Sequence, residues 1–156
     1  MKSAWFILGV TVVGCVPVAP APPAPRTAMA VSQSVAKTWE AAIDVFAERN
    51  IPIKTLDRSS GLVVAEPMKV GTADASLADC GKDAMGIVQY PTDATWNLLV
   101  RGDSAQSTIK ATVRFIRVGM SRAALSTQTV SEECSTRGTW ETQFEQQVKA
   151  AAEAKK

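Results

Sequence analysis

The sequence contains no histidine, and this absence removes common forms of enzyme chemistry. A Ser-His-Asp or Cys-His arrangement needs an imidazole base, so neither can be assembled. The commonest zinc ligand is missing as well, and two widely spaced cysteines do not replace it. A phosphate-binding glycine motif and a Cys-x-x-Cys pair are also absent. We therefore expect no catalytic residues, no metal and no cofactor, although the sequence leaves a Ser-Lys dyad open.

Aromatic residues are scarce, at 6% of the chain. Sugar cleavage by paired carboxylates needs a cleft lined with aromatic side chains, whereas Trp39, Trp96 and Trp140 fall on predicted core faces. Three aspartates lie close together in one loop, without the spacing of a calcium-binding loop. We interpret these three as solvated loop acids: Asp74, Asp79 and Asp83. A hydrolase is therefore the weakest of the function classes considered.

Neither charge nor apolar runs dominate the chain. There are 17 Lys and Arg residues against 15 Asp and Glu residues, with no basic run, so nucleic acid is not an expected partner. The apolar stretch at residues 4–13 has about ten residues, whereas a membrane-spanning helix needs roughly 20. This segment is too short to be a stable spanning anchor.

The N-terminal segment instead has the features of an exported lipoprotein. A cationic start and a short apolar run lead to residues 12–15, Val-Val-Gly-Cys, which resemble a bacterial lipobox. In that family the cysteine is lipidated and the preceding peptide is removed. We predict a signal peptide at residues 1–14 and acyl chains, such as palmitate, on Cys15. An ordinary secretory signal with a chance cysteine is the alternative, and a buried N-terminal strand fits less well.

Residues 15–29 are predicted to form a proline-rich tether. Such a segment is extended and semi-rigid, at roughly 3 Å per residue. Three acyl chains would anchor the protein to a membrane essentially permanently. Val16 follows Cys15 where an aspartate resembles an inner-membrane retention signal, so we favour the periplasmic face of the outer membrane. The inner membrane stays open as an alternative.

The cysteine count is consistent with lipidation, because Cys15 leaves Cys80 and Cys134 as a pair. An oxidising compartment favours a disulfide between these two cysteines. The bridge would close a loop of about 55 residues, which the chain-entropy model relates to about 4 kcal/mol of stability. Two free thiols are the alternative.

The remaining residues, 30–156, predict a single α+β domain. Apolar residues at steps of three and four predict helices over residues 31–49 and 139–154. Alternating or β-branched segments predict strands at residues 51–56, 61–66, 95–101, 108–118 and 124–130. A turn is expected near Gly119, and irregular stretches over residues 68–93 and 131–138 carry the two cysteines. The expected fold is an antiparallel sheet of about four to five strands with two helices packed on one face.

Basic residues gather on the predicted polar face of the sheet. Arg101, Lys110 and Arg114 could form a cationic face that meets anionic lipid head groups or acidic patches of a partner. The alternative is an ordinary solvated face, on which lysine and arginine also discourage edge-to-edge pairing.

The first half of the domain resembles a known family. A helix carrying Trp39 and Phe46 leads into Ile51-Pro52-Ile53 and then a hairpin whose turn is Asp57-Arg58-Ser59-Ser60-Gly61. This order resembles the BamC (NlpB-like) outer-membrane assembly lipoproteins, and the lipobox matches as well. The resemblance covers roughly residues 31–66. It implies a small helix-grip fold and an accessory role in β-barrel assembly.

Together these features suggest a non-enzymatic, lipid-anchored envelope protein. Our first hypothesis is an interaction or adaptor module with an envelope protein partner, accessory to an outer-membrane assembly complex. The alternative is a periplasmic carrier or sensor of a small apolar or lipid ligand. That alternative predicts a cavity between helix and sheet, lined by Phe46, Ile109, Val113 and Phe115.

Overall fold

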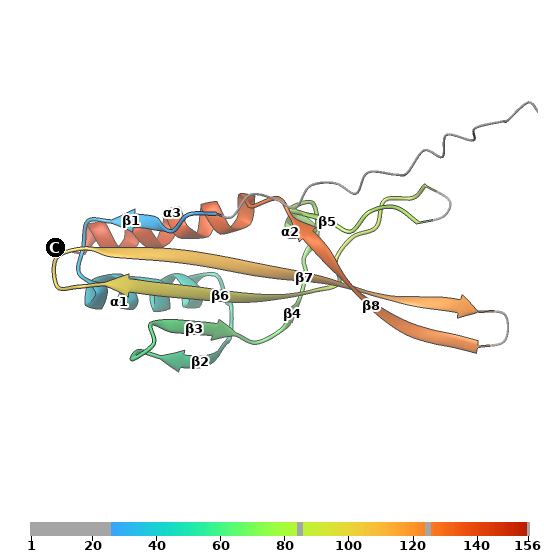
Figure 1. The fold of residues 1–156 in the computed structure, drawn as a ribbon, viewed down its shortest axis with the longest axis horizontal. Helices are drawn as coiled ribbons and strands as arrows, with labels where there is room; N and C mark the ends of the chain where they lie inside the picture. Colours follow the sequence, from blue (N-terminus) through green and yellow to red (C-terminus); the bar gives the residue numbers. More distant parts are fainter. Residues whose placement is uncertain (1–25, 84–85, 124–125, 156) are drawn as a thin grey trace, which may run out of the picture.

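The computed structural model describes residues 26–83, 86–123 and 126–155, and Figure 1 shows their arrangement. The N-terminal half contains a short strand β1 (Met29–Val31), a helix α1 (Val35–Glu48), a hairpin of β2 (Ile53–Asp57) and β3 (Leu62–Ala65), and β4 (Met68–Lys69). A short helix α2 (Thr72–Ala75) and β5 (Ala78–Asp79) follow. The chain then forms three long strands, β6 (Asp93–Gly102), β7 (Ser107–Ala123) and β8 (Ser126–Thr136), and ends in α3 (Thr139–Ala154).

The strands form one antiparallel sheet in the order β2-β3-β6-β7-β8-β5, with β1 beside β7 and β4 beside β6. The prediction of four to five strands and two helices is therefore wrong, because the described residues form eight strands and three helices. The additional elements are β1, β4, β5 and α2. Each has only two to four residues, too few to show a strand or helix period in the sequence.

The core lies between the sheet and the pair α1 and α3, which pack on each other and on one sheet face. Phe46 of α1 meets Phe144 of α3 edge to face, with ring centroids 5.0 Å apart. Trp96 of β6 lies 5.6 Å from Trp140 of α3. Alternation along β6 and β7 supplies the rest of the buried face: Leu98, Val100, Ile109, Ala111, Val113 and Phe115.

The ends of α1 follow from local residue chemistry. The Ser34 hydroxyl accepts a hydrogen bond from the Lys37 backbone N–H, as an N-cap does. Asn50 has a φ of 53°, a left-handed conformation that ends the helix. Ser34 and Lys37 have Ser-x-x-Lys spacing, but the Lys37 ammonium donates to the Lys155 carbonyl, 3.2 Å away. The serine and lysine therefore serve the helix end and show no dyad contact.

Two predicted boundaries in the C-terminal half are wrong. Gly119, where a turn is expected, lies inside β7 opposite Val130. Glycine favours turns because it readily adopts a positive φ. Gly119 does not have a positive φ, and its backbone continues the strand. The stretch predicted as a loop around Cys134 belongs largely to β8, which continues to Thr136 because β7 and β5 supply its partners.

Arg26, the first described residue, fixes the point at which the chain joins the domain. The backbone N–H of Ala111 lies between the segments of β7 that β1 and β8 cover, and it donates to Glu145, 2.7 Å away. Arg26 forms an ion pair with the same carboxylate at 2.8 Å and donates to the Ala111 carbonyl at 3.3 Å. Glu145 is buried, so this pair satisfies the backbone groups that no strand covers.

Candidate interaction surface: the β7–β8 arm and the stapled loop

The longest strands extend beyond the helix-covered part of the sheet. β6 pairs with β7 only as far as Ile116, whereas β8 accompanies β7 from Phe115 to Ala123. Beyond this point β7 and β8 form a two-stranded ribbon, which projects from the body in Figure 1. We call residues 117–123 and 126–132 the arm.

The arm carries exposed apolar side chains. Val118 is 41% exposed and Met120 is 82% exposed, and both continue the outward face of β7. An isolated two-stranded ribbon is marginally stable in water, so a projecting ribbon needs support at its base or from a partner.

One edge of the arm also presents unpaired backbone groups. The Val118 N–H points away from β8, since it donates to the Thr92 hydroxyl at 3.0 Å. Opposite residues of an antiparallel pair point either toward each other or away from each other. Ser131 and Thr129, opposite Val118 and Met120, therefore direct their N–H groups away from β7. Among the described residues, β8 has a second strand partner only at Ser135 and Thr136, so this edge is open.

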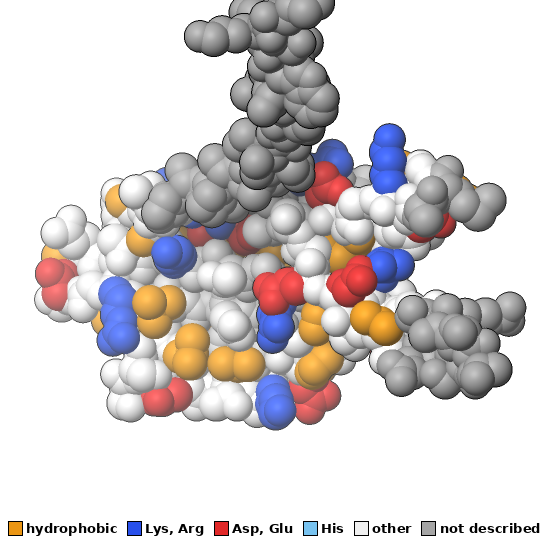
Figure 2. Space-filling view, turned by 45° about the vertical axis from the view of Figure 1, so that its right-hand side comes forward, with side chains coloured by type: hydrophobic (Ala, Val, Ile, Leu, Met, Phe, Trp, Pro, Cys, Tyr) orange, Lys and Arg blue, Asp and Glu red, His pale blue; other side chains and the backbone are white. Residues whose placement is uncertain are grey.

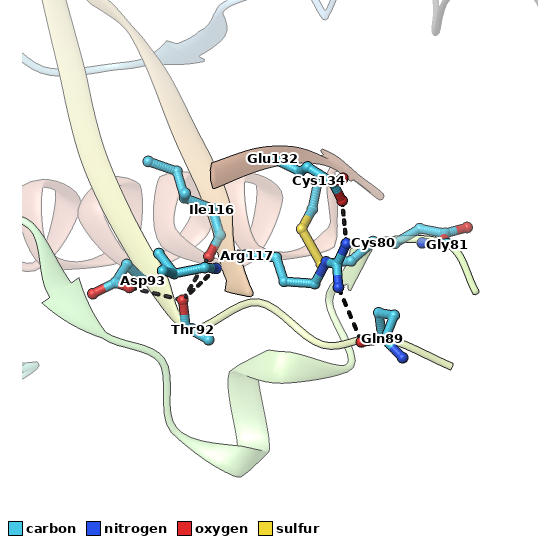
Figure 3. The surroundings of a disulfide bond; sticks show 11 residues. Cys80, Gly81, Gln89, Thr92, Asp93, Ile116, Arg117, Glu132 and Cys134 are labelled. Carbon is cyan, nitrogen blue, oxygen red and sulfur yellow. Dashed lines mark hydrogen bonds and ion pairs between the residues drawn. A yellow bond between two sulfur atoms is a disulfide. The ribbon is translucent and has the colours of Figure 1, made fainter. Parts of the chain in front are cut away.

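A disulfide between Cys80 and Cys134 holds the base of the arm (Figure 3). The two cysteines are 54 residues apart in sequence, and Cys134 lies opposite Phe115, where β7 leaves the core. Next to the bridge, β5 adds backbone pairs to the end of β8. The cysteines thus fasten the long connection between β4 and β6 to the strand that forms the arm.

Arg117 also links the arm to the segment between β4 and β6 (Figure 3). Its Nη2 pairs with Glu132 across the ribbon, and its Nη1 donates to Gln89, 3.1 Å away. Its Nε is buried without a hydrogen-bond partner among the described residues. A guanidinium that bridges both segments fixes the loop against the arm.

The connection between β5 and β6, which we call the stapled loop, has its own exposed apolar side chains. Ile87, Val88 and Tyr90 are 56%, 49% and 57% exposed. On the face drawn in Figure 2, apolar side chains are interspersed with charged ones rather than forming one continuous area. The stapled loop and the arm therefore present several separate apolar side chains at one end of the molecule, without a continuous apolar patch.

The three residues of the predicted cationic face lie on the same face of the sheet, but one of the three is paired with an acid. Arg101, Lys110 and Arg114 are exposed and share the sheet face opposite the helices. Arg114 pairs with Glu133 at 2.8 Å, which offsets its charge. Arg101 and Lys110 make no ion pair within the part of the chain that the structure describes. Two exposed cations are a weak basis for binding a membrane surface.

The other predicted site residues lie apart from this surface or outside the described ranges. Cys15 and the rest of the signal peptide belong to the residues that the structure does not describe. The loop acids act locally: Asp79 accepts from the Gly81 N–H and Asp83 from the Ile87 N–H. Within the described ranges, no cluster of acidic and cysteine side chains could hold a metal ion, and no helix has the length and apolarity to cross a membrane.

The cavity that the carrier hypothesis requires is filled by core packing. Phe46, Ile109 and Phe115 are fully buried, and Val113 is 4% exposed. Phe46, Ile109 and Phe115 do not line the cavities beside Arg49, Trp39 or Cys134, although Val113 borders the last of these. A lipid ligand therefore has no space at that position.

Comparison with known proteins finds neither a family model that matches this sequence nor a curated protein with significant similarity to it.

Proposed function

We propose that this protein is a lipid-anchored component of the bacterial cell envelope that binds a protein partner through the arm and catalyses no reaction. The observation that carries this proposal is the arm itself. It joins an open strand edge to exposed apolar side chains at Val118 and Met120. An open edge favours addition of a strand from a partner, since main-chain hydrogen bonds give affinity and side chains on alternate positions give specificity.

The N-terminal segment supports the location. A signal peptide, a lipobox cysteine at Cys15 and a proline-rich stretch together make a membrane tether. Arg26, within the predicted tether, forms an ion pair with buried Glu145 of α3. We propose the outer membrane, on its periplasmic face, as the site of attachment.

The resemblance of residues 31–66 to the BamC (NlpB-like) lipoproteins supports a more specific role. On this basis we propose that the partner belongs to a complex that assembles outer-membrane proteins. A role in assembly fits a domain with an unpaired strand edge, because such an edge can pair with an extended β-strand segment of a partner.

Site-specific photo-crosslinking in living cells tests the proposal. A photoreactive amino acid at Met120, on the arm, is compared with one at Thr112, which is exposed on the same face of the same strand but within the body. We expect a discrete cross-linked species of higher mass from position 120 and little from position 112. Excess unlabelled protein should compete with its formation.

Two outcomes would overturn the proposed contact. Equal cross-linking from both positions would indicate random collisions at the membrane. A product containing two copies of this chain would replace the envelope partner with self-association.

A further inference from the structure

A second site lies away from the arm, where the end of α1 and the start of α3 meet the β4–α2 connection. A cavity of about 420 Å³ opens there between Arg49, Asp74, Trp96 and Trp140. Its volume falls within the range of small-molecule sites, roughly 300–1,000 Å³. Met68 and Val70 supply apolar wall from the opposite side.

Arg49 is held in place but not fully used. Its guanidinium carbon lies 5.5 Å from the ring centroids of both Trp140 and Phe144, a cation–π arrangement. Its Nε donates to Gln147 at 2.6 Å, while its terminal nitrogens make no hydrogen bond within the described part of the chain. The fork of donors that recognises a carboxylate is therefore oriented and unoccupied by protein.

The charges around the cavity leave Arg49 as its available cation. Lys69 also lines the cavity, but it pairs with Asp93 at 2.8 Å and its side chain is 81% exposed. Burial lowers the pKa of Arg49, and the carboxylate of Asp74 opposes that shift. No ion pair joins Arg49 to Asp74 among the described residues. The Asp74 carboxylate therefore acts on the Arg49 charge from a distance and accepts no hydrogen bond from its guanidinium. Bringing an anion to Arg49 would offset the burial of its charge.

The aromatic floor adds an apolar component. Trp140 is stacked on Phe144, and Trp96 lies beside Trp140. The indole N–H of Trp96 is buried without a hydrogen-bond partner among the described residues, so hydrogen bonding at this end of the core is incomplete. Side chains of this kind favour the hydrocarbon part of a ligand whose polar end is held elsewhere.

We propose that this cavity binds a small carboxylate with a short apolar body, with Arg49 as the carboxylate anchor and Trp96 and Trp140 as the apolar wall. Such a group occurs in a free fatty acid with a short acyl chain and in an acylated amino acid or peptide end. Either source presents the same two features to the cavity. An inorganic anion has no apolar body to contact the tryptophans, and an apolar amine has no anion for Arg49, so both should bind more weakly.

Binding is measured by tryptophan fluorescence of the full-length protein in nanodiscs, with four probes. Hexanoate and N-acetyl-leucine carry both features, whereas hexylamine carries the apolar body with a cation in place of the anion, and inorganic phosphate carries only the anion. We expect a Kd on the order of 1 mM for at least one of the two carboxylates. Their relative affinity distinguishes an acyl chain from a peptide end. Hexylamine and phosphate should bind at least about tenfold more weakly.

Two variants separate the proposed role of Arg49 from a structural one. Arg49→Gln should weaken carboxylate binding about tenfold or more, because a charge-assisted bond is lost. Asp74→Asn leaves Arg49 in place and removes a nearby negative charge, so it should strengthen carboxylate binding about two- to fivefold. Circular dichroism of each variant verifies that the fold is retained.

Several results would overturn the proposal. Absence of binding by both carboxylates would do so, as would hexylamine or phosphate binding as tightly as the carboxylates. Weaker carboxylate binding by Asp74→Asn would show that the Asp74 carboxylate supports ligand binding rather than opposing it, contrary to the proposed electrostatics. Since none of these measurements involves the arm, their outcome is independent of the proposed partner contact.

Discussion

Among single residues, Asp57 is a surface acid whose carboxylate is held by its own turn. It ends β2, and its carboxylate accepts hydrogen bonds from the Ser59 hydroxyl at 2.6 Å and from the backbone N–H groups of Ser59 and Ser60. Hydrogen bonds from these two serines lower the pKa of Asp57 to about 2. The ionised form therefore stabilises the turn between β2 and β3.

The sign of the pH effect follows from this lowered pKa. The contribution of Asp57 to stability is fully present above the ordinary aspartate pKa of 3.8 and is lost as the pH falls toward 2. We predict that Asp57→Asn, which keeps an acceptor oxygen, weakens the dependence of unfolding free energy on pH below about 4. Urea unfolding of both proteins across that pH range measures it. An unchanged acid dependence would contradict the role assigned to Asp57.

Arg26 and Glu145 give a second prediction at this scale. Removing one partner of a buried ion pair leaves a charge without compensation. Arg26→Met should lower the free energy of unfolding by about 2–3 kcal/mol, somewhat less than for a fully buried pair because Arg26 is 28% exposed. Arg26→Lys should recover part of the loss. The double variant Arg26→Met, Glu145→Gln keeps an acceptor for the Ala111 N–H and should be more stable than Arg26→Met alone, and the opposite order would exclude this explanation.

Sequence patterns could not reveal this pair. Glu145 follows Phe144 directly and resembles a solvated residue beside the apolar stripe of a helix. It is buried because its partners, the Ala111 N–H and Arg26, come from parts of the chain 34 and 119 residues away. The same limit applies to Arg49, whose role depends on rings and a carboxylate from other elements. Periodicity describes one element at a time and does not contain such contacts.

At the scale of elements, the long helices and strands could be predicted and the short ones could not. The helix at Thr139–Ala154 has the predicted bounds, and the alternation of β7 places Ile109 inward and Lys110 outward as expected. Three residues show no period, so the sequence predicts that Met29–Val31 belongs to the tether and the helix start. β1 forms because the backbone edge of β7 at Ser107–Ile109 is available for pairing, and this depends on the tertiary structure.

The disulfide is predicted to stabilise both the domain and the base of the arm. Replacing both cysteines, Cys80→Ser with Cys134→Ser, should lower the free energy of unfolding by about 4 kcal/mol in the chain-entropy model. Protease cleavage within residues 80–92 should become faster before global unfolding occurs, because the stapled loop loses its attachment. Denaturant unfolding and limited proteolysis measure the two effects. Equal stability with and without the bridge would exclude a stabilising role.

The open edge of the arm gives a prediction that separates main-chain from side-chain recognition. Thr129→Pro removes an N–H that points away from β7, so the ribbon should still form. We expect cross-linking from Met120 to fall several-fold, since a partner strand could no longer pair there. Thr129→Val is the matched control and should leave the cross-link unchanged. Equal yields from the two variants would show that strand addition is not used.

The whole molecule divides into a helix-covered sheet and a projecting end formed by the arm and the stapled loop. The helix-covered sheet provides stability, and the arm with the stapled loop provides the proposed contact surface. Arg26 joins the residues before it to the start of α3, on the side of the domain where the disulfide also lies.

The number of strands is the part of the molecular architecture that the sequence does not predict. Five of the eight strands have alternating or β-branched patterns long enough to recognise. The sequence does not predict the arm, because Gly119 and Ser131 both favour loops. In the structure, pairing between β7 and β8 keeps both residues extended. The projecting ribbon, and with it the candidate contact surface, follows from β7 and β8 being longer than their partners.

Intact-mass spectrometry of the mature protein, extracted from envelopes of the producing cells, tests whether the domain is anchored through Cys15. We predict a species that begins at Cys15, carries a diacylglycerol and an N-terminal acyl chain there, and has Cys80 and Cys134 without their thiol hydrogens. A Cys15→Ser variant should lack the lipid mass and should leave the membrane fraction. A mature protein with an unmodified Cys15, or with an N-terminus elsewhere, would contradict the claim.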